Sequence, residues 1–177
     1  MIEKLSIHLQ RELRSDHAGE TGAVYIYKGI VDVASWRGDT ELLYFAKAQG
    51  VTEAEHLSLI EDWLPRAQRS LLLGPWRLAG WLTGALPAMF GRQSVYRTIA
   101  AVETFVDQHY QQQIDHIKSF GGPTELLSLL IKCQADEQEH RDESQALATE
   151  KSSFLIESWC RLVGWGSGAA VMLARRV

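Results

Sequence analysis

Apolar residues recur at helical spacing along almost the whole chain, and no stretch shows the sustained alternation of a strand. Glycines, prolines and N-cap residues divide this pattern into six predicted helices. We expect them over about residues 4–36, 40–64, 75–90, 93–120, 124–149 and 153–174. The sequence therefore predicts an all-α protein.

An internal repeat relates the two halves of the chain, about residues 4–90 and 93–175. The segment Arg77–Ala85 recurs as Arg161–Ala169, and other matches keep nearly the same shift (161 − 77 = 84). Repeated segments in order at one offset indicate a structural unit used more than once. We interpret residues 1–177 as a single domain built from a three-helix unit used twice.

Two Glu-x-x-His motifs occupy equivalent places in these halves, Glu53/His56 and Glu137/His140, at the same shift (137 − 53 = 84). Residues three apart lie on one face of a helix, so each pair can bind one metal ion. A dinuclear site in a four-helix bundle also takes one carboxylate from each of the two other helices. Glu20 and Glu103 match this need, because they precede the two motifs by almost equal separations (53 − 20 = 33; 137 − 103 = 34).

The predicted ligand set contains four carboxylates and two imidazoles, which suit iron or manganese and include no thiolate. A lone Glu-x-x-His is more often a solvated helix face, and the duplication is what favours metal binding here. Glu55 and Glu139 have the wrong spacing and are expected to face water or the surroundings of the site. The sequence predicts a ferritin-like four-helix bundle that holds two iron ions.

Other polar residues close to these motifs are expected to orient the ligands. They are Asp16, His17, Asp107, His109 and Asp136. Tyr27 and Tyr110 follow Glu20 and Glu103 by two helical turns, and a role as core residues or a role in the reaction both fit this position.

Leu71–Phe90 and Phe154–Ala174 are the most apolar segments, and four of the six tryptophans lie in them. Pro75, Arg77 and Pro87 interrupt the first and Glu157 and Arg161 the second, unlike a membrane span. We predict two additional apolar helices that lie in the membrane interface, and the alternative is a pair that covers the end of the bundle. The motifs Gly80-x-x-x-Gly84 and Gly164-x-x-x-Gly168 predict that these two helices pack closely on one another.

The net charge of −4 argues against a general nucleic-acid-binding protein. Two distant cysteines, Cys133 and Cys160, form neither a zinc motif nor a disulfide framework, which favours a reducing compartment. The first residues are polar and charged and contain no apolar signal core.

Several motifs resemble those of the demethoxyubiquinone hydroxylases, the di-iron monooxygenases of ubiquinone biosynthesis. The similar segments are Asp16–Glu20, Gly22-Ala23, Ile26–Gly29, Ala101–Glu103, His109-Tyr110, Asp136–His140 and Gly80–Gly91. The resemblance implies a ferritin-like fold with an iron site formed by the six proposed ligands. It also implies O2-dependent hydroxylation of a polyprenylated methoxy-methyl-benzoquinol, with NADH as an external electron donor. The family's tyrosine beside a histidine corresponds to Tyr110 and His109, which suggests a catalytic gating or relay role.

A polyprenyl quinol substrate implies contact with a membrane surface through Leu71–Phe90 and Phe154–Ala174. The expected location is the cytoplasmic face of a bacterial inner membrane, or the matrix side of the mitochondrial inner membrane. Other ubiquinone-biosynthesis proteins and a second copy of the chain are further candidate partners. Three competing functions use similar features: a ferroxidase or iron-storage protein, a membrane-associated di-iron quinol oxidase, and a non-catalytic membrane-associated helical bundle.

Overall fold

A computed structural model describes residues 5–177 and contains six α-helices and one short 3-10 helix. The helices are α1 (Ile7–Arg37), α2 (Thr40–Trp63), η1 (Arg66–Gln68), α3 (Leu73–Phe90), α4 (Arg92–Phe120), α5 (Thr124–Leu147) and α6 (Phe154–Ala174). Residues 5–177 include no strand, so the predicted all-α class is confirmed.

The helix ends agree with the predicted stop and start signals to within a few residues. Gly38 ends α1 in the left-handed conformation with φ 69°, which costs glycine no Cβ strain. Asp39 then caps α2 by accepting a hydrogen bond from the Leu42 N–H. α3 begins at Leu73, two residues before the expected Pro75. The predicted start of the first helix at Lys4 lies outside the described residues.

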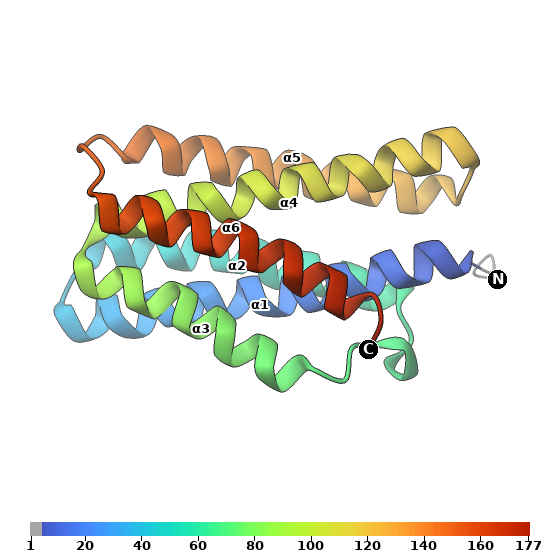
Figure 1. Cartoon of the computed structure of the whole chain (residues 1–177), viewed down its shortest axis with the longest axis horizontal. Helices are drawn as coiled ribbons and strands as arrows, with labels where there is room; N and C mark the ends of the chain where they lie inside the picture. The colour runs from blue at the N-terminus through green and yellow to red at the C-terminus, as the bar shows by residue number, and fades with distance from the viewer. Residues whose placement is uncertain (1–4) are drawn as a thin grey trace.

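Two helical hairpins form the bundle, as Figure 1 shows. α1 and α2 make one hairpin, and α4 and α5 make the other. In the sequence α3 connects the two hairpins, and it runs back along the outside of the bundle. α6 follows the second hairpin and ends close to the N-terminal end of α1 (Figure 1). This arrangement agrees with a ferritin-like four-helix bundle plus two further helices. The duplication of a three-helix unit stays a prediction.

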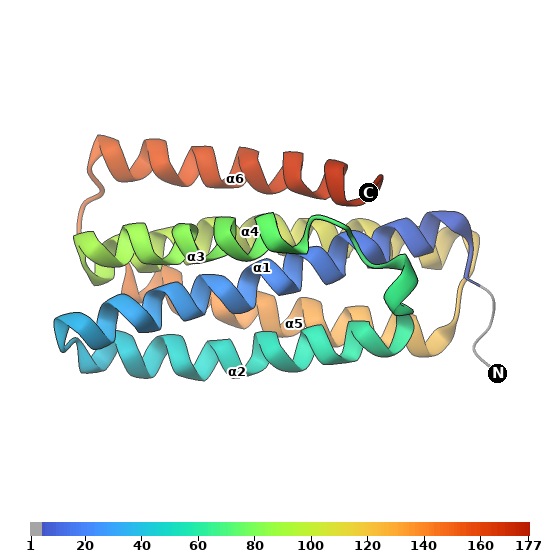
Figure 2. The same ribbon diagram turned by 90° about the horizontal axis from the view of Figure 1, so that it is seen from below.

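α1 and α4 lie centrally in contact with the other helices, and in Figure 2 α6 runs along one side of them and α2 and α5 along the other. α3 packs on α1, and α6 packs on α4 and α1, so these two helices cover one side of the bundle. α2 and α5 lie on the opposite side. We call α3 and α6 the outer layer.

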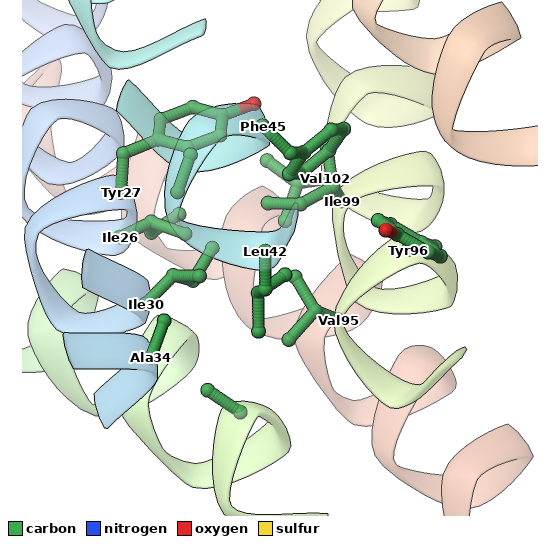
Figure 3. Packing of buried hydrophobic residues seen from close by; sticks show 12 residues of the cluster. Ile26, Tyr27, Ile30, Ala34, Leu42, Phe45, Val95, Tyr96, Ile99 and Val102 are labelled. Carbon is green, nitrogen blue, oxygen red and sulfur yellow. The ribbon is translucent and has the colours of Figure 1, made fainter. Parts of the chain in front are cut away.

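The core consists of two apolar clusters near opposite ends of the bundle. One contains Ile26, Ile30, Leu42 and Ile99, and Figure 3 shows their packing. The other contains Leu9, Leu13, Ile60, Leu64, Ile114, Ile117, Leu126 and Leu130. The predicted ligands lie between these clusters along each helix, so packed side chains at both ends fix the four helices that carry them.

The expected packing of the two glycine motifs on one another is wrong. A Cβ placed on Gly80 would come within 2.3 Å of the Gly22 carbonyl oxygen, and one on Gly84 within 1.9 Å of the Ile26 oxygen, so α3 packs against α1. Gly164 has nothing within 4 Å of its Cβ position, and Gly168 faces only the ring of Phe105. Small residues allow close approach to any helix, and the motif does not specify which one.

None of the helices in residues 5–177 combines the length and apolar character that crossing a bilayer requires. Large apolar side chains of the outer layer are nevertheless exposed. Examples are Leu78 at 61 %, Phe90 at 78 % and Trp165 at 74 % exposure.

Candidate metal centre

The six predicted ligands come together in the middle of the bundle. Each of them is at most 6 % exposed. They form two overlapping groups, in each of which the ligand atoms lie within 4.8 Å of one another. The groups are Glu20, Glu53, His56 and Glu137, and Glu53, Glu103, Glu137 and His140. Glu53 and Glu137 belong to both groups, which is the position of carboxylates that bridge two ions.

The helices place these ligands as a dinuclear site requires. α1 and α4 each supply one glutamate, and α2 and α5 each supply a Glu-x-x-His pair. Facing helices of a bundle direct such residues toward a common centre.

Several polar atoms at this centre are buried and accept or donate no hydrogen bond among residues 5–177. They are Glu20 Oε2, Glu53 Oε1, Glu137 Oε2 and His140 Nδ1. His140 Nδ1 and Glu53 Oε1 lie only 3.0 Å apart, but their directions do not suit a hydrogen bond. Buried polar atoms without partners are costly, and four at one point require a compensating group. Hard carboxylate oxygens and imidazole nitrogens fit a pair of iron or manganese cations.

Electrostatics at the centre also favour cations. Burial, together with the negative charge of Glu137, raises the pKa of Glu20 to about 8. Burial and the neighbouring carboxylates likewise raise the pKa of Glu53 and that of Glu103 well above the usual value. Two divalent ions would supply the positive charge that lets these carboxylates ionise together.

The pKa values of Glu137 and His56 shift so as to favour the charged forms, unlike those of the other three glutamate ligands. Burial alone would raise the pKa of Glu137, but its contacts with His140 and His56 lower it to about 2. Burial alone would lower the pKa of His56, but Glu137 and the charge of Glu20 raise it to about 9. Without metal, the His56 proton therefore stands in for part of the missing positive charge.

Asp136 holds the His56 ring from outside the centre. Asp136 Oδ2 lies 3.0 Å from His56 Nε2, while His56 Nδ1 faces inward at 3.1 Å from Glu137 Oε1. A carboxylate behind an imidazole fixes the ring orientation and raises its basicity as a ligand. Asp136 thus lies where the sequence analysis expected an orienting residue.

The two tyrosines reach across the bundle in a crossed arrangement. Tyr110 on α4 donates its hydroxyl proton to Glu20 Oε1 of α1 at 2.5 Å. Tyr27 on α1 lies with its hydroxyl 3.3 Å from Glu103 Oε1 of α4. Each tyrosine therefore contacts the glutamate that the first helix of the other hairpin contributes to the centre.

Gln49 is a residue near the centre that the sequence analysis missed. It accepts a hydrogen bond from the Tyr27 hydroxyl at 2.6 Å and donates one to Glu143 Oε2 at 2.7 Å. Gln49 precedes Glu53 by four residues and thus shares its helix face, which is the signal that could have found it.

His109 lies beside the centre and is fixed by a buried carboxylate. His109 Nε2 lies 3.0 Å from Asp16 Oδ1 and 3.2 Å from Ser15 Oγ. Gln113 also donates to Asp16 Oδ1, at 2.7 Å. The expected importance of Asp16 is therefore for the orientation of His109, not of a metal ligand.

Besides Asp16, two more residues that were expected to orient metal ligands have other partners. His17 is buried against Glu61, with 3.1 Å between Nε2 and Oε1. Asp107 accepts hydrogen bonds from Gln134 and Gln138 and pairs with Arg141. Both predictions were wrong because helical spacing gives the face of a residue but not which neighbour reaches it first.

The excluded glutamates lie at the surface as expected. Glu55 is exposed and pairs with Lys132 at 3.1 Å, and Glu139 is also exposed. Both are useful controls for the buried ligands.

A cavity of about 390 Å³ joins the centre to the outer layer. Its lining includes the carboxylates Glu20, Glu53, Glu103 and Glu137, together with His109 and Tyr110. The outer layer contributes Trp76, Trp159 and Trp165, among others. A mostly apolar cavity with a few converging polar groups is the usual form of a small-molecule site.

The family model described as "Ubiquinone biosynthesis protein COQ7" matches residues 7–174 of the chain. The chain belongs to this family. The match runs from the first residue of α1 to the last residue of α6, and the COQ7 family is the one that the sequence motifs resembled.

Named relatives agree with this assignment. The chain is 33 % identical over 168 residues to a 3-demethoxyubiquinol 3-hydroxylase of Rhodospirillum rubrum, covering 90 % of this chain and 77 % of that protein. It is 29 % identical over 172 residues to the mitochondrial NADPH-dependent 3-demethoxyubiquinone 3-hydroxylase of Dictyostelium discoideum, covering 96 % and 77 %. The rat protein of the same name is 29 % identical over 171 residues, covering 93 % and 76 %. These COQ7 relatives are named as hydroxylases, and two of the names give NADPH where we expected NADH.

Proposed function

We propose that this COQ7-family chain hydroxylates the ring of a polyprenylated methoxy-methyl-benzoquinol in ubiquinone biosynthesis. In this reaction one oxygen atom of O2 enters a ring C–H bond, and the other leaves as water. The balance requires two electrons and two protons from an external donor. The names of the relatives support this substrate class.

One observation carries the proposal: a single cavity reaches from the exposed apolar layer to the four carboxylates. A quinol ring can enter this cavity head first, while its isoprenoid tail stays against the apolar helices. A ferroxidase needs no such apolar path, because its substrate is an ion.

The fit of the donor set supports two irons, held by Glu20, Glu53, His56, Glu103, Glu137 and His140. Glu53 and Glu137, which belong to both ligand groups, would be shared, and Glu20 and Glu103 would each complete one group. When bound, the irons would supply the redox chemistry that activates O2.

The protein's own residues then position and protect the reaction. Tyr110 holds one oxygen of Glu20 by its short hydrogen bond, which fixes that carboxylate. Asp16 holds the Nε2 side of His109, so Nδ1 can accept a hydrogen bond from a quinol hydroxyl in the cavity. The tryptophans of the outer layer limit the access of water.

We expect the electrons to come from a reduced nicotinamide. NADH was the expectation from the sequence resemblance, whereas NADPH appears in the names of two relatives. Parallel assays with each donor decide between them.

We further propose that the outer layer contacts a membrane surface. Its exposed apolar side chains support this, since large apolar patches are rare on proteins that contact only water. The location would be the cytoplasmic face of a bacterial inner membrane or the matrix side of the mitochondrial one. Other ubiquinone-biosynthesis proteins and a second copy of the chain remain proposed partners.

The decisive experiment supplies ¹⁸O2, a demethoxyubiquinol and a reduced nicotinamide to the iron-loaded protein and measures the quinone by mass spectrometry. A hydroxylase places one ¹⁸O in the ring. A quinol oxidase would return unlabelled quinone and labelled water, and a ferroxidase would turn over without quinol. Either result would overturn the proposal.

A matched pair of variants tests the site itself. Glu103→Ala should abolish turnover and lower iron below two per chain, while its circular dichroism stays helical. Glu139→Ala removes an exposed glutamate and should behave like the wild type. Retained activity in Glu103→Ala would remove Glu103 from the ligand set.

A further inference from the structure

Basic residues are unevenly distributed around this acidic chain. Residues 63–102, which contain α3, carry five arginines and no carboxylate. Residues 151–177, which contain α6, carry four basic residues and one glutamate. The whole chain has a net charge of −4, so these two stretches, which contain and flank α3 and α6, are positive in contrast to the rest.

Four arginines line one groove at the edge of the outer layer. The groove has a volume of about 460 Å³ and lies where the end of α6 meets the first turns of α1. Its lining consists of Ile7, Gln10, Arg11, Arg14, Arg175 and Arg176. We call it the arginine groove.

Two of the arginines are fixed by hydrogen bonds to residues that do not line the groove. Arg175 donates to Oε2 of the buried Glu12 through Nε at 3.0 Å and Nη2 at 2.7 Å. Arg14 donates through Nε to the Gln68 carbonyl oxygen at 2.6 Å. Arg11 and Arg176 are exposed. Since Glu12 compensates one positive charge, the groove keeps an excess of cationic groups.

The groove adjoins apolar surface and the cavity. Met172 and Leu173, which precede the two C-terminal arginines, are 59 % and 44 % exposed. Ala174 and its neighbours Ala170 and Val171 line the cavity beside the metal centre. A ligand with a phosphate and an apolar chain would satisfy both surfaces at once.

We propose that the arginine groove binds the phosphate of an anionic phospholipid headgroup. Guanidinium groups bind phosphate oxygens through paired N–H donors, and fixed guanidiniums lose less entropy on binding. Basic residues at the edge of a membrane-contacting surface are attracted to anionic lipids. The groove would thereby hold the C-terminal end of α6 on the membrane, next to the cavity.

The test measures binding of the full chain to vesicles of phosphatidylcholine, with and without added phosphatidylglycerol. Arg11→Gln with Arg176→Gln should weaken binding to the anionic vesicles by about 25-fold, at about fivefold per arginine. Binding to pure phosphatidylcholine should not change. Lys47→Gln with Lys118→Gln removes the same charge from exposed positions of α2 and α4 and should change binding by no more than about twofold.

Equal losses in the two double variants would show diffuse attraction and overturn the groove as a site. Inorganic phosphate alone, at matched ionic strength, should not stabilise the protein thermally. Stabilisation of the wild type but not of the groove variant would assign the groove to free phosphate instead of lipid.

The inference rests on the membrane contact in the proposed function, and the outcomes separate the two. A wild type that binds neither kind of vesicle contradicts the membrane contact itself. A wild type that binds both kinds equally contradicts only the arginine groove. Neither result depends on turnover.

Discussion

α2 and α6 have similar lengths, 24 and 21 residues, yet they use their side chains in opposite ways. α2 buries Gln49, Glu53 and His56 beside Leu42 and Ile60. α6 is among the most apolar helices and buries only Ala174. α3 resembles α6, since its buried residues are all small.

Between its two apolar clusters the bundle thus buries charged side chains, while its outer layer exposes apolar ones, and both features depart from the usual soluble arrangement. Buried carboxylates without partners require cations, and an exposed apolar layer requires an apolar neighbour. The buried carboxylates therefore indicate a metal cofactor, and the exposed outer layer indicates an apolar neighbour outside the protein.

Removal of a shared interior ligand should have the largest effect. Glu137→Ala removes a carboxylate common to both ligand groups and leaves His56 without its inward partner. We expect turnover to fall roughly a thousandfold or more, beyond the 10–100-fold typical of residues that only support a ligand. Iron analysis and turnover assays measure this, with Glu139→Ala as the exposed control. Full iron content in Glu137→Ala would contradict a bridging role.

The interior should also make iron binding strongly dependent on pH. Without metal, Glu20 with a pKa of about 8 and His56 with a pKa of about 9 both carry protons at pH 7. The pKa of Glu53 and that of Glu103 are raised as well, so iron must displace several protons and its affinity should rise with pH up to at least about 9. Each displaced proton changes the affinity by about tenfold per pH unit, or about a hundredfold for two. Anaerobic Fe(II) titrations at several pH values measure the slope, and a flat profile would contradict protonated ligands.

The junction between the two regions can be tested at the glycine motifs. Gly84→Ala places a Cβ against the Ile26 carbonyl oxygen and should cost about 2 kcal/mol of unfolding free energy by overpacking. Gly164→Ala meets open space and should be neutral or stabilising, because alanine favours the helix. Thermal melts of both variants provide the comparison. Equal destabilisation would indicate that the two motifs play the same packing role.

Changes on the outer layer should have the smallest effect on the folded protein. Leu162→Gln with Trp165→Gln replaces side chains that are 56 % and 74 % exposed. Unfolding free energy should change by no more than about 0.5 kcal/mol, as for ordinary surface positions. Affinity for phosphatidylcholine vesicles should fall about tenfold, since apolar area is lost from the contact. A large loss of stability with unchanged vesicle binding would place these side chains in a protein contact.

The sequence by itself determined the helices and the six proposed ligands. Helical spacing places Glu53 with His56 and Glu137 with His140, and the constant shift between the two halves singles them out from Glu55 and Glu139. These are local properties of a helix, and a periodic pattern records them directly.

Only the tertiary structure decided which helices meet. The packing of α3 on α1, the crossed contacts of Tyr27 and Tyr110 and the link from Gln49 to Glu143 all join distant parts of the chain. The cavity is lined by residues of the bundle and of both α3 and α6, so it too depends on how distant helices pack. A helix pattern gives the face that a residue occupies, whereas the partner of that face depends on how all the helices pack together.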